Sequence, residues 1–311
     1  MIERKILLKE HTTYRIGGPA AYFSKVETRE DIGRTLAEWK ALGREMSEIF
    51  IMGGGANVLF PDSGFDGLIM KIAIDRIELI GSDLIEAGAG TKMKDVVEFA
   101  ATSGLTGIEW ASGLPGYLGG AIRGNAGAFG GEMKDSVIQV ESVRFSEPDF
   151  IIKRGNTECD FGYRSSIYKT EGGEVIIGAK IRLIPGDRDE ITKKMVEYAA
   201  YRKEHQPLEF PSAGSTFKNV DVRMISDDQK REWASVIKMD PFPVIPVAFL
   251  LSEAGLKGKR VGGATISEKH PNFFVNDQDA TAEDVKKLIT LAKEKVKEKF
   301  NIDIEPEIQI I

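Results

Sequence analysis

SGLPGYLGGAIRGNAGAFGGE, residues 112–132, is the stretch around which the rest of the chain is organised. Eight of its twenty-one residues are glycine. So many positions without a Cβ indicate a backbone that adopts positive φ repeatedly, or one that another group approaches closely. Successive free N–H groups in such a turn form a nest that holds an anion such as a diphosphate. From this stretch alone, a tight structural loop is an equally good interpretation.

Two further glycine turns precede this stretch. Residues 51–60 read IMGGGANVLF, an apolar run that enters three glycines and an asparagine. Residues 84–91 read LIEAGAGT, a strand pattern followed by a glycine turn and a predicted helix cap at Thr91. Neither turn has the G-x-G-x-x-G spacing of a Rossmann fingerprint, and no P-loop motif occurs. Several unlike glycine turns favour a cofactor threaded between loops over one bound at a single fingerprint turn.

Further motifs extend the pattern along the chain. Residues 11–19 read HTTYRIGGP, residues 161–166 FGYRSS, residues 211–219 PSAGSTFKN and residues 305–307 EPE. With the two glycine loops, and in this order, they resemble the UDP-N-acetylenolpyruvoylglucosamine reductase (MurB) family, in its shorter, type II-like subclass. That family is part of the flavoprotein superfamily that includes p-cresol methylhydroxylase and vanillyl-alcohol oxidase. The resemblance covers nearly the whole chain.

The resemblance implies an α+β fold with three domains. Residues 1–80 and 81–200 would form a two-part FAD-binding region of the vanillyl-alcohol oxidase type, and residues 201–311 an α+β substrate-binding domain. The residue pattern agrees, because a boundary is predicted near residues 186–205. The implied activity is NADPH-dependent reduction of UDP-N-acetylglucosamine enolpyruvate to UDP-N-acetylmuramate in peptidoglycan precursor synthesis. FAD would be bound without a covalent link, since the first glycine loop has no His or Cys.

The family's catalytic set falls on Arg164, Ser215 and Glu307. Arg164 would hold the charge that develops on the substrate carboxylate, and Ser215 would give a proton to the adjacent carbon. Glu307 would stabilise the enol form or orient the proton donor. Without the resemblance, a structural ion pair is the better interpretation of Arg164, and a backbone cap that of Ser215. Glu307 would then lie on the solvent side of an edge strand.

The resemblance also assigns binding residues. Gly119 and Gly120 are expected to adopt positive φ beside the diphosphate. Lys218 and Asn219 are matched to positions that contact the substrate, while Tyr168 and His270 are pocket candidates for which structural roles are favoured. The full set matched to FAD is Tyr14, Gly53, Gly54, Gly55, Ala56, Asn57, Val58, Gly113, Leu114, Pro115, Gly116, Gly119, Gly120, Ile122, Asn125, Ala126, Gly127 and Arg202.

The composition of the chain limits which partners, disulfides, metals and cellular locations are expected. The 311 residues carry a net charge of −6, which argues against a nucleic-acid or anionic-membrane partner. The single cysteine, Cys159, excludes an internal disulfide and is expected to be a small buried residue. No signal peptide or membrane span is indicated, so a cytoplasmic location is expected. The histidines lack metal-ligand spacing, no metal is expected, and no obligatory protein partner is evident.

Periodicity predicts the main elements. Residues 20–26, 49–52, 67–72 and 77–80 are predicted strands of one small layer, with a helix over residues 28–43. A helix over 91–103 is followed by antiparallel strands at 139–145, 150–153 and 174–183. Further helices are predicted over 189–205, 246–254 and 281–300, and a strand over 272–276. Residues 302–310 alternate apolar and polar, and Pro306 makes them an edge or bulged strand.

Two departures from the family pattern affect local details. Val220 stands where many relatives have proline, and Gln309 stands where many have a basic residue. The chain also lacks room for the substrate-covering tyrosine loop of the longer subclass. Two alternatives stay open: an oxidase of the same fold that is reoxidised by dioxygen, and a flavin or nucleotide-sugar binding module without catalysis.

Overall fold

The computed structural model describes residues 1–311, which separate into two compact units. The first unit contains Met1–Ile6, Ala20–Gly54 and Phe65–Tyr201, and the second contains Leu7–Pro19, Gly55–Gly64 and Arg202–Ile311. The main change of unit falls between Tyr201 and Arg202. The division into three domains at residues 80 and 200 stays a prediction. The two N-terminal segments of the second unit were not predicted. No helix is both long and apolar enough to cross a membrane.

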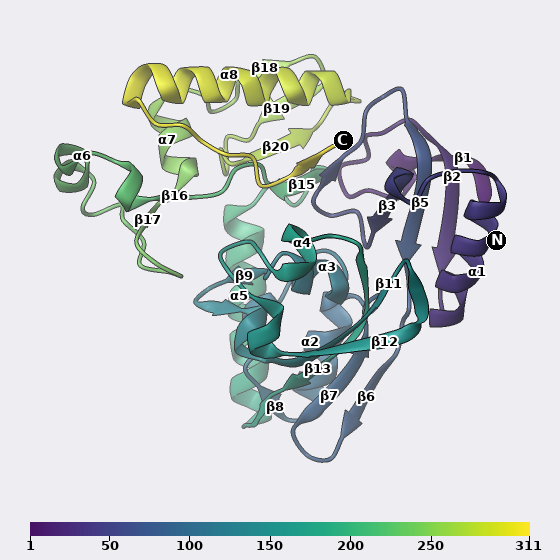
Figure 1. The fold of residues 1–311 in the computed structure, drawn as a ribbon. Coiled ribbons are helices and arrows are strands. Elements are labelled where there is room, and N and C mark those ends of the chain that lie inside the picture. Colours follow the sequence, from purple (N-terminus) through teal and green to yellow (C-terminus); the bar gives the residue numbers. More distant parts are fainter. The chain divides into compact units, whose positions relative to one another are not determined.

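The first unit begins with a four-stranded sheet (Figure 1). Its order is β1-β2-β5-β3, and β2, β5 and β3 run parallel. Helix α1 (Arg29–Ala41) lies within the predicted helix over residues 28–43 and starts at a capping box between Thr28 and Asp31. It buries Trp39, whose ring meets that of Tyr22 edge-on at 5.1 Å. The strands are β1 (Glu3–Leu7), β2 (Pro19–Val26), β3 (Ile49–Met52) and β5 (Phe65–Ile72).

A five-stranded antiparallel sheet completes the first unit, in the order β12-β11-β13-β7-β6. The prediction that residues 77–80 belong to the first layer is wrong, because β6 pairs with β7 in this sheet. The reason is local: Gly81 has φ +68° and lets the chain turn back at once into a hairpin. The strands are β6 (Ile77–Ile80), β7 (Leu84–Gly88), β11 (Val137–Arg144), β12 (Glu147–Gly155) and β13 (Glu174–Arg182).

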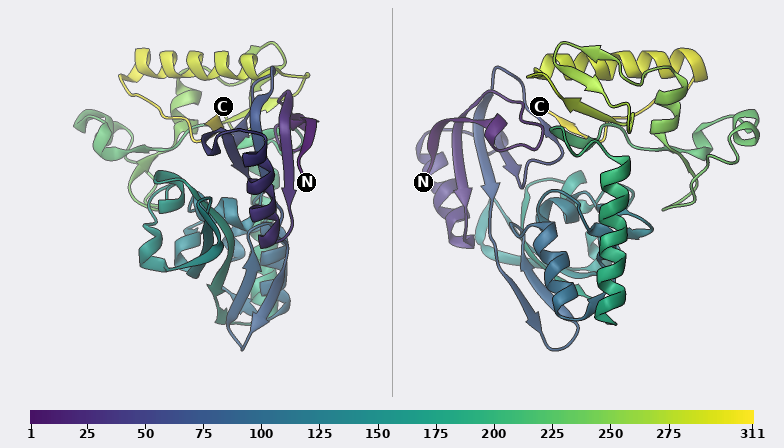
Figure 2. Two further views of the ribbon diagram at one scale, coloured as in Figure 1. Left: turned by 45° about the vertical axis from the view of Figure 1, so that its right-hand side comes forward. Right: turned by 180° about the vertical axis from the view of Figure 1, so that it is seen from behind.

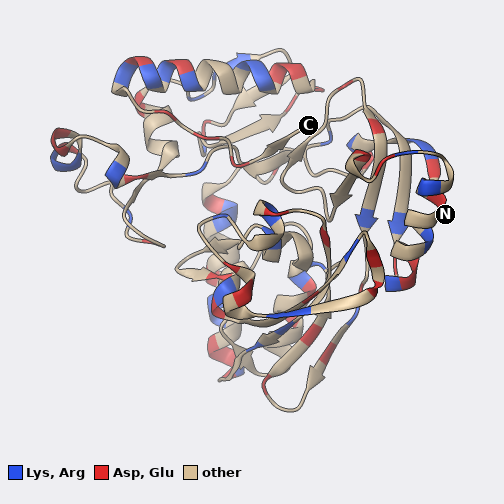
Figure 3. Cartoon of the chain, viewed as in Figure 1, with Lys and Arg blue, Asp and Glu red and all other residues tan.

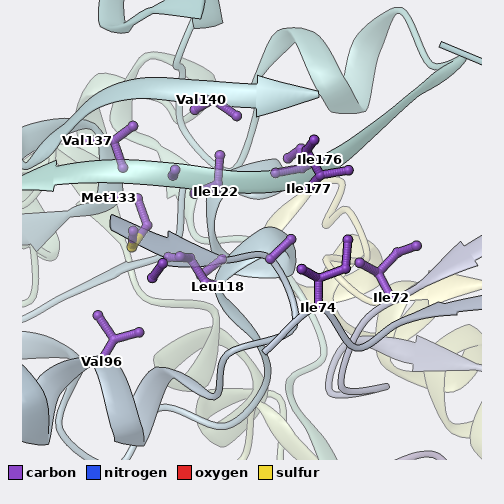
Figure 4. Packing of buried hydrophobic residues seen from close by; sticks show 14 of the residues in the cluster. Ile72, Ile74, Val96, Leu118, Ile122, Met133, Val137, Val140, Ile176 and Ile177 are labelled. Carbon is purple, nitrogen blue, oxygen red and sulfur yellow. The ribbon is translucent and has the colours of Figure 1, made fainter. Parts of the chain in front are cut away.

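Short helices pack on this sheet through apolar side chains. Leu118 and Ile122 point into the same cluster as Met133, Val137 and Val96 (Figure 4). Thr91 is not the cap of the following helix, because its hydroxyl donates to the Arg76 carbonyl at 2.9 Å and Lys92 takes the N-cap position. The helices are α2 (Met93–Thr102), α3 (Leu118–Arg123), α4 (Ile167–Thr170) and α5 (Arg188–His205); the short strands are β8 (Leu105–Thr106), β9 (Gly127–Ala128), β10 (Gly131–Glu132) and β14 (Ile184–Pro185).

The second unit is a four-stranded antiparallel sheet with a long helix along it (Figure 2). The helix α8 (Ala282–Phe300) lies within the predicted helix over residues 281–300, starts at a capping box between Thr281 and Asp284 and buries one apolar face. Acidic and basic residues alternate along it (Figure 3). The sheet order is β15 (Ser212–Ser215), β20 (Phe273–Asn276), β19 (Ala264–Ile266), β18 (Arg260–Val261). The remaining elements are α6 (Asp227–Glu232), α7 (Val247–Glu253), β4 (Val58–Leu59), β16 (Val220–Asp221), β17 (Val244–Ile245) and β21 (Gln309–Ile310).

The C-terminal alternation is confirmed only in part. Ile302, Ile304 and Ile308 are buried, but Ile310 is 38% exposed. Only β21 forms a strand, and it runs parallel to β4, while Pro306 makes a single bridge to Phe217. Proline has no N–H to continue a ladder, so the pairing is interrupted at that position.

Candidate active site

The glycine-rich stretch 112–132 folds into three successive local structures. Residues 113–117 form a turn with positive φ at Gly113 and Gly116, α3 follows, and β9 and β10 close a hairpin. At the hairpin tip, Phe129 and Gly130 have φ +52° and +83°, as the tightest two-residue hairpins require. The Phe129 ring stacks on Tyr198 with centroids 4.4 Å apart. The stretch is therefore not one continuous nest.

The expectation of positive φ at Gly119 and Gly120 is wrong, because both residues lie inside α3. Gly119 is required by packing: a Cβ there would lie 2.9 Å from the Cβ of Ala89. Gly131 is likewise required, since a Cβ would lie 2.3 Å from the Trp110 ring. A Cβ on Gly120 would meet nothing within 4 Å. Gly120 thus leaves open space on the face of α3 opposite Leu118 and Ile122.

The first glycine turn lies directly on the second. A Cβ on Gly54 would be 3.0 Å from the Cα of Gly116 and 3.2 Å from the Tyr117 ring. The N–H of Met93, at the start of α2, donates to the Gly116 carbonyl at 3.1 Å. The contact between Gly54 and Gly116 brings the two glycine turns together within the first unit, and it needs glycine where the backbones touch.

The remainder of the first glycine turn belongs to the second unit. Gly55 has φ +66°, and its carbonyl accepts the N–H of Thr13 at 3.1 Å. The Asn57 amide donates to the Glu307 carbonyl at 3.2 Å. Tyr14 is buried, and its hydroxyl has no hydrogen-bond partner in the protein; desolvation raises the pKa of this hydroxyl far above its usual range.

Arg164 lies at the tip of a tight turn in the first unit. Gly162 and Ser165 exchange backbone hydrogen bonds of 3.1 and 3.2 Å, which leaves Tyr163 and Arg164 at the tip. Arg164 has φ +54°, a conformation that costs a non-glycine residue about 1–3 kcal/mol. Its Nη2 donates to the Gly127 carbonyl at 3.1 Å, and its guanidinium lies 5.5 Å from the Tyr163 ring centroid. The side chain is thereby directed from a fixed backbone.

Ser215 and Glu307 come together in the second unit. The N–H of Glu307 donates to the carbonyl of Thr216 at 2.8 Å, so Glu307 is bonded to the residue that follows Ser215. Gly214 has φ +76°, and Ser215 ends β15 opposite Phe273. Two motifs far apart in the sequence are thus adjacent in the fold, as a shared site needs. The roles of both residues remain predictions.

Asn272 supports this pair and was missed from the sequence. Its Oδ1 accepts the N–H of Phe217 at 2.9 Å, and its Nδ2 donates to the Phe217 carbonyl at 2.8 Å. Its own carbonyl accepts the N–H of Thr216 at 2.7 Å. One buried residue therefore fixes the segment after Ser215. An asparagine just before a strand gives no signal in the sequence that would separate it from an ordinary turn residue.

Other candidates have identifiable protein partners. Lys218 Nζ pairs with Glu305 at 2.7 Å, and Asn219 Oδ1 accepts the first N–H of α7 at 3.2 Å. Arg202 lies in the last turn of α5. Tyr168 is buried with its hydroxyl 3.8 Å from the sulfur of Cys159, which is buried as expected. The binding roles of Lys218, Asn219 and Arg202 remain predictions.

The burial of His270 predicts that acid destabilises the folded protein. Burial, and the charges of Lys238 and His205, lower its pKa from 6.5 to about 4. Between pH 6.5 and pH 4, His270 is therefore protonated in the unfolded chain but stays neutral in the folded chain. We expect stability to be greatest above pH 6.5 and to fall by about 3 kcal/mol as the pH drops to 4. Urea unfolding at several pH values should show that the free energy of unfolding of His270→Gln falls less steeply with decreasing pH than that of the wild-type protein. The same dependence on pH in both proteins would contradict this prediction.

Comparison with known proteins agrees with this architecture. Residues 206–311 match the family model of the UDP-N-acetylenolpyruvoylglucosamine reductase C-terminal domain, and residues 20–148 match an FAD binding domain. The chain is 39% identical over 304 residues to the UDP-N-acetylenolpyruvoylglucosamine reductase of Caldanaerobacter subterraneus subsp. tengcongensis, covering 98% of this chain and 91% of that protein. The Fervidobacterium nodosum enzyme of the same name is 37% identical, with 97% and 89% covered.

A solved structure is similar over its whole length. The crystal structure of UDP-N-acetylenolpyruvylglucosamine reductase (MurB) from Thermus caldophilus superposes with a TM-score of 0.77 at 32% identity, covering 100% of this chain and 98% of that one. The predicted α+β fold is confirmed. The paired glycine turns and the matched FAD binding domain define a flavin-dependent oxidoreductase. Within that class, the chain belongs to the UDP-N-acetylenolpyruvoylglucosamine reductase (MurB) family.

The residues present fit FAD. The backbone of Gly54 packs against that of Gly116, the Tyr117 side chain lies against Gly53 and Gly54, and Gly120 leaves open space beside α3. Backbone of this kind admits a diphosphate closely. Within the second unit, the buried Tyr14 hydroxyl has no protein partner.

Proposed function

We propose that this chain catalyses the NADPH-dependent reduction of UDP-N-acetylglucosamine enolpyruvate to UDP-N-acetylmuramate in peptidoglycan precursor synthesis. The observation that carries the proposal is the adjacency of the Ser215 and Glu307 motifs in a chain that also holds an FAD binding domain. The reaction would take place in the cytoplasm. It needs no nucleic acid, membrane or obligatory protein partner.

The glycine turns at residues 53–58 and 113–127, with Tyr14 and Arg202, would hold the cofactor. When bound, FAD supplies a hydride that comes from NADPH. The hydride and one proton add across the carbon–carbon double bond of the enolpyruvyl group, which becomes a D-lactyl ether. The chain's own residues must therefore orient the substrate, stabilise the charge that develops and deliver the proton.

Arg164 would stabilise the substrate carboxylate as negative charge moves onto it. A planar guanidinium matches a carboxylate with two parallel hydrogen bonds, and its effect increases away from bulk water. The left-handed backbone at Arg164 and its bond to Gly127 hold the group before substrate arrives. Such preorganised donors act without reorganisation during the reaction.

Ser215 would donate the proton, and Glu307 would assist it. A serine hydroxyl is a weak acid, so it can act only where a neighbour stabilises the enol form or orients the donor. The hydrogen bond between Glu307 N–H and Thr216 fixes the spacing of these two residues.

We expect Arg164→Lys to bind the sugar nearly normally but to turn over about 100-fold more slowly. Lysine keeps the positive charge and loses the two-point contact with the carboxylate. Steady-state measurements should show a fall in kcat with a small change in KM. Near-normal kcat would mean that Arg164 has only a structural role.

An oxidase of the same fold is the main alternative, and one experiment separates the two. The protein is mixed with NADPH without oxygen until its visible absorbance band is bleached. Either air-saturated buffer or the enolpyruvyl sugar is then added, and the return of the band is timed. The proposal expects rapid return with the sugar and slow return with air. Rapid return with air and none with the sugar would establish the oxidase.

A further inference from the structure

The side chain of Asn125 joins the glycine-rich stretch to the turn that carries Arg164. Its Nδ2 donates to the Gly162 carbonyl at 3.0 Å and to Glu132 Oε1 at 3.3 Å, and its Oδ1 accepts the N–H of Lys134 at 3.0 Å. The residue is fully buried. Both amide donors and the amide oxygen are therefore engaged by the protein. The partners also fix which amide atom is nitrogen, since two of them only accept and the third only donates.

Two more hydrogen bonds tie the same two segments together. Arg164 Nη2 donates to the Gly127 carbonyl at 3.1 Å, and the Ser166 hydroxyl donates to the Arg123 carbonyl at 2.8 Å. With the bond from Asn125 to Gly162, three side chains link residues 162–166 to residues 123–127. Of the three links, only the one from Asn125 holds the base of the turn, where Gly162 and Ser165 exchange their backbone bonds.

The residue type at position 125 meets two demands at once. Its φ of +40° is left-handed, which glycine, asparagine and aspartate adopt most readily. Glycine has no side chain to bond with, and an ionised aspartate would face the Gly162 carbonyl and the Glu132 carboxylate with no donor. Asparagine alone combines this backbone conformation with two donors and an acceptor. The prediction that Asn125 contacts FAD stays a prediction, but its amide already has these protein partners.

We propose that Asn125 is a positioning residue for Arg164. It holds the turn so that Arg164 keeps its left-handed backbone, and it makes the glycine-rich stretch and the turn move as one body. Ordering of the stretch by bound cofactor would then also order the arginine. The inference rests on the catalytic role proposed for Arg164, and Asn125 itself acts only through that residue.

Hydrogen exchange tests the structural half without any activity measurement. Asn125→Gly keeps the positive φ and removes only the amide. In this variant the backbone N–H groups of residues 162–166 should exchange about tenfold faster, as loss of one buried hydrogen bond produces. The matched control is Asn156→Ala, which removes an amide whose two hydrogen bonds go to the carbonyls of Lys134 and Val137 at 2.7 Å and not to the turn. Unchanged exchange of residues 162–166 in Asn125→Gly would overturn the inference.

A double-mutant cycle tests the functional half at saturating FAD, with FAD affinity measured separately. Asn125→Gly should lower kcat about tenfold in the wild-type chain but less than about threefold in the Arg164→Lys background, because it acts through the arginine. Equal losses in both backgrounds would overturn the inference. Normal kcat for Arg164→Lys would instead overturn the catalytic role of Arg164, and the exchange result would still decide whether Asn125 orders the turn.

Discussion

In the Ser215→Ala variant, NADPH should bleach the visible absorbance band at the normal rate. The band should then fail to return when the enolpyruvyl sugar is added. The first half of the reaction, in which NADPH bleaches the band, needs no proton at the sugar carbon and therefore does not involve the serine. The second half needs a proton on the carbon next to the one that receives the hydride. Loss of a general acid typically slows such a step by about 10²- to 10⁴-fold. Rapid mixing without oxygen measures the two halves separately.

Two further variants sharpen this test. Ser215→Cys should recover part of the loss, because a thiol can still give a proton. Ser212→Ala, at the start of the same strand, removes a hydroxyl that only accepts the N–H of Gly214 at 3.4 Å, and it should react normally. If Ser215→Ala slows both halves equally, the serine shapes the pocket and another group supplies the proton.

Gly120→Val should lose FAD while the protein stays folded. The position has no protein atom within 4 Å of an added Cβ, so a side chain there occupies only the space left beside α3. We expect FAD affinity to fall at least about 100-fold, equivalent to about 2.7 kcal/mol, with a nearly unchanged melting temperature. Fluorescence titration of the stripped protein and thermal unfolding measure the two quantities.

Gly119→Val is the matched comparison and should behave differently. Its side chain would collide with Ala89, which lies 2.9 Å from the added Cβ, so the variant should be destabilised by roughly 1–3 kcal/mol. Normal FAD affinity in a folded Gly120→Val protein would show that the open space beside α3 does not receive the cofactor.

Local patterns in the sequence predicted most of the individual elements. Helix α1 was recognisable because Glu30 and Asp31 stand in its first turn, and helix α8 because Thr281 caps it and its apolar residues recur at helical spacing. Pairing across long sequence distances was not recognisable. Nothing near Val58 indicated that β4 would pair with β21 at the C-terminus, or that residues 7–19 would join the second unit. The error at Thr91 came from a partner that the local pattern does not show, the Arg76 carbonyl, whereas the error at β6 came from the tight turn at Gly81.

The site was predicted from motifs whose roles the resemblance supplied. The number of glycines singled out residues 112–132 but did not give the reason for each glycine, and the cofactor contacts of this stretch stay predictions. Gly119 and Gly131 are needed for packing, whereas Gly120 leaves open space, and only the surrounding atoms separate these cases. Asn125 and Asn272 illustrate the same limit, because their roles depend on which carbonyl and N–H groups the fold brings beside them.

Formation of UDP-N-acetylmuramate by the purified protein tests the central claim most directly. The protein is incubated with NADPH and UDP-N-acetylglucosamine enolpyruvate in the absence of oxygen. The sugar nucleotides are then separated, and their masses are measured by mass spectrometry. We predict one reduced sugar for each NADPH consumed, with the product two hydrogens heavier than the substrate. Consumption of NADPH only when oxygen is present, with the enolpyruvyl sugar recovered unchanged, would contradict the account.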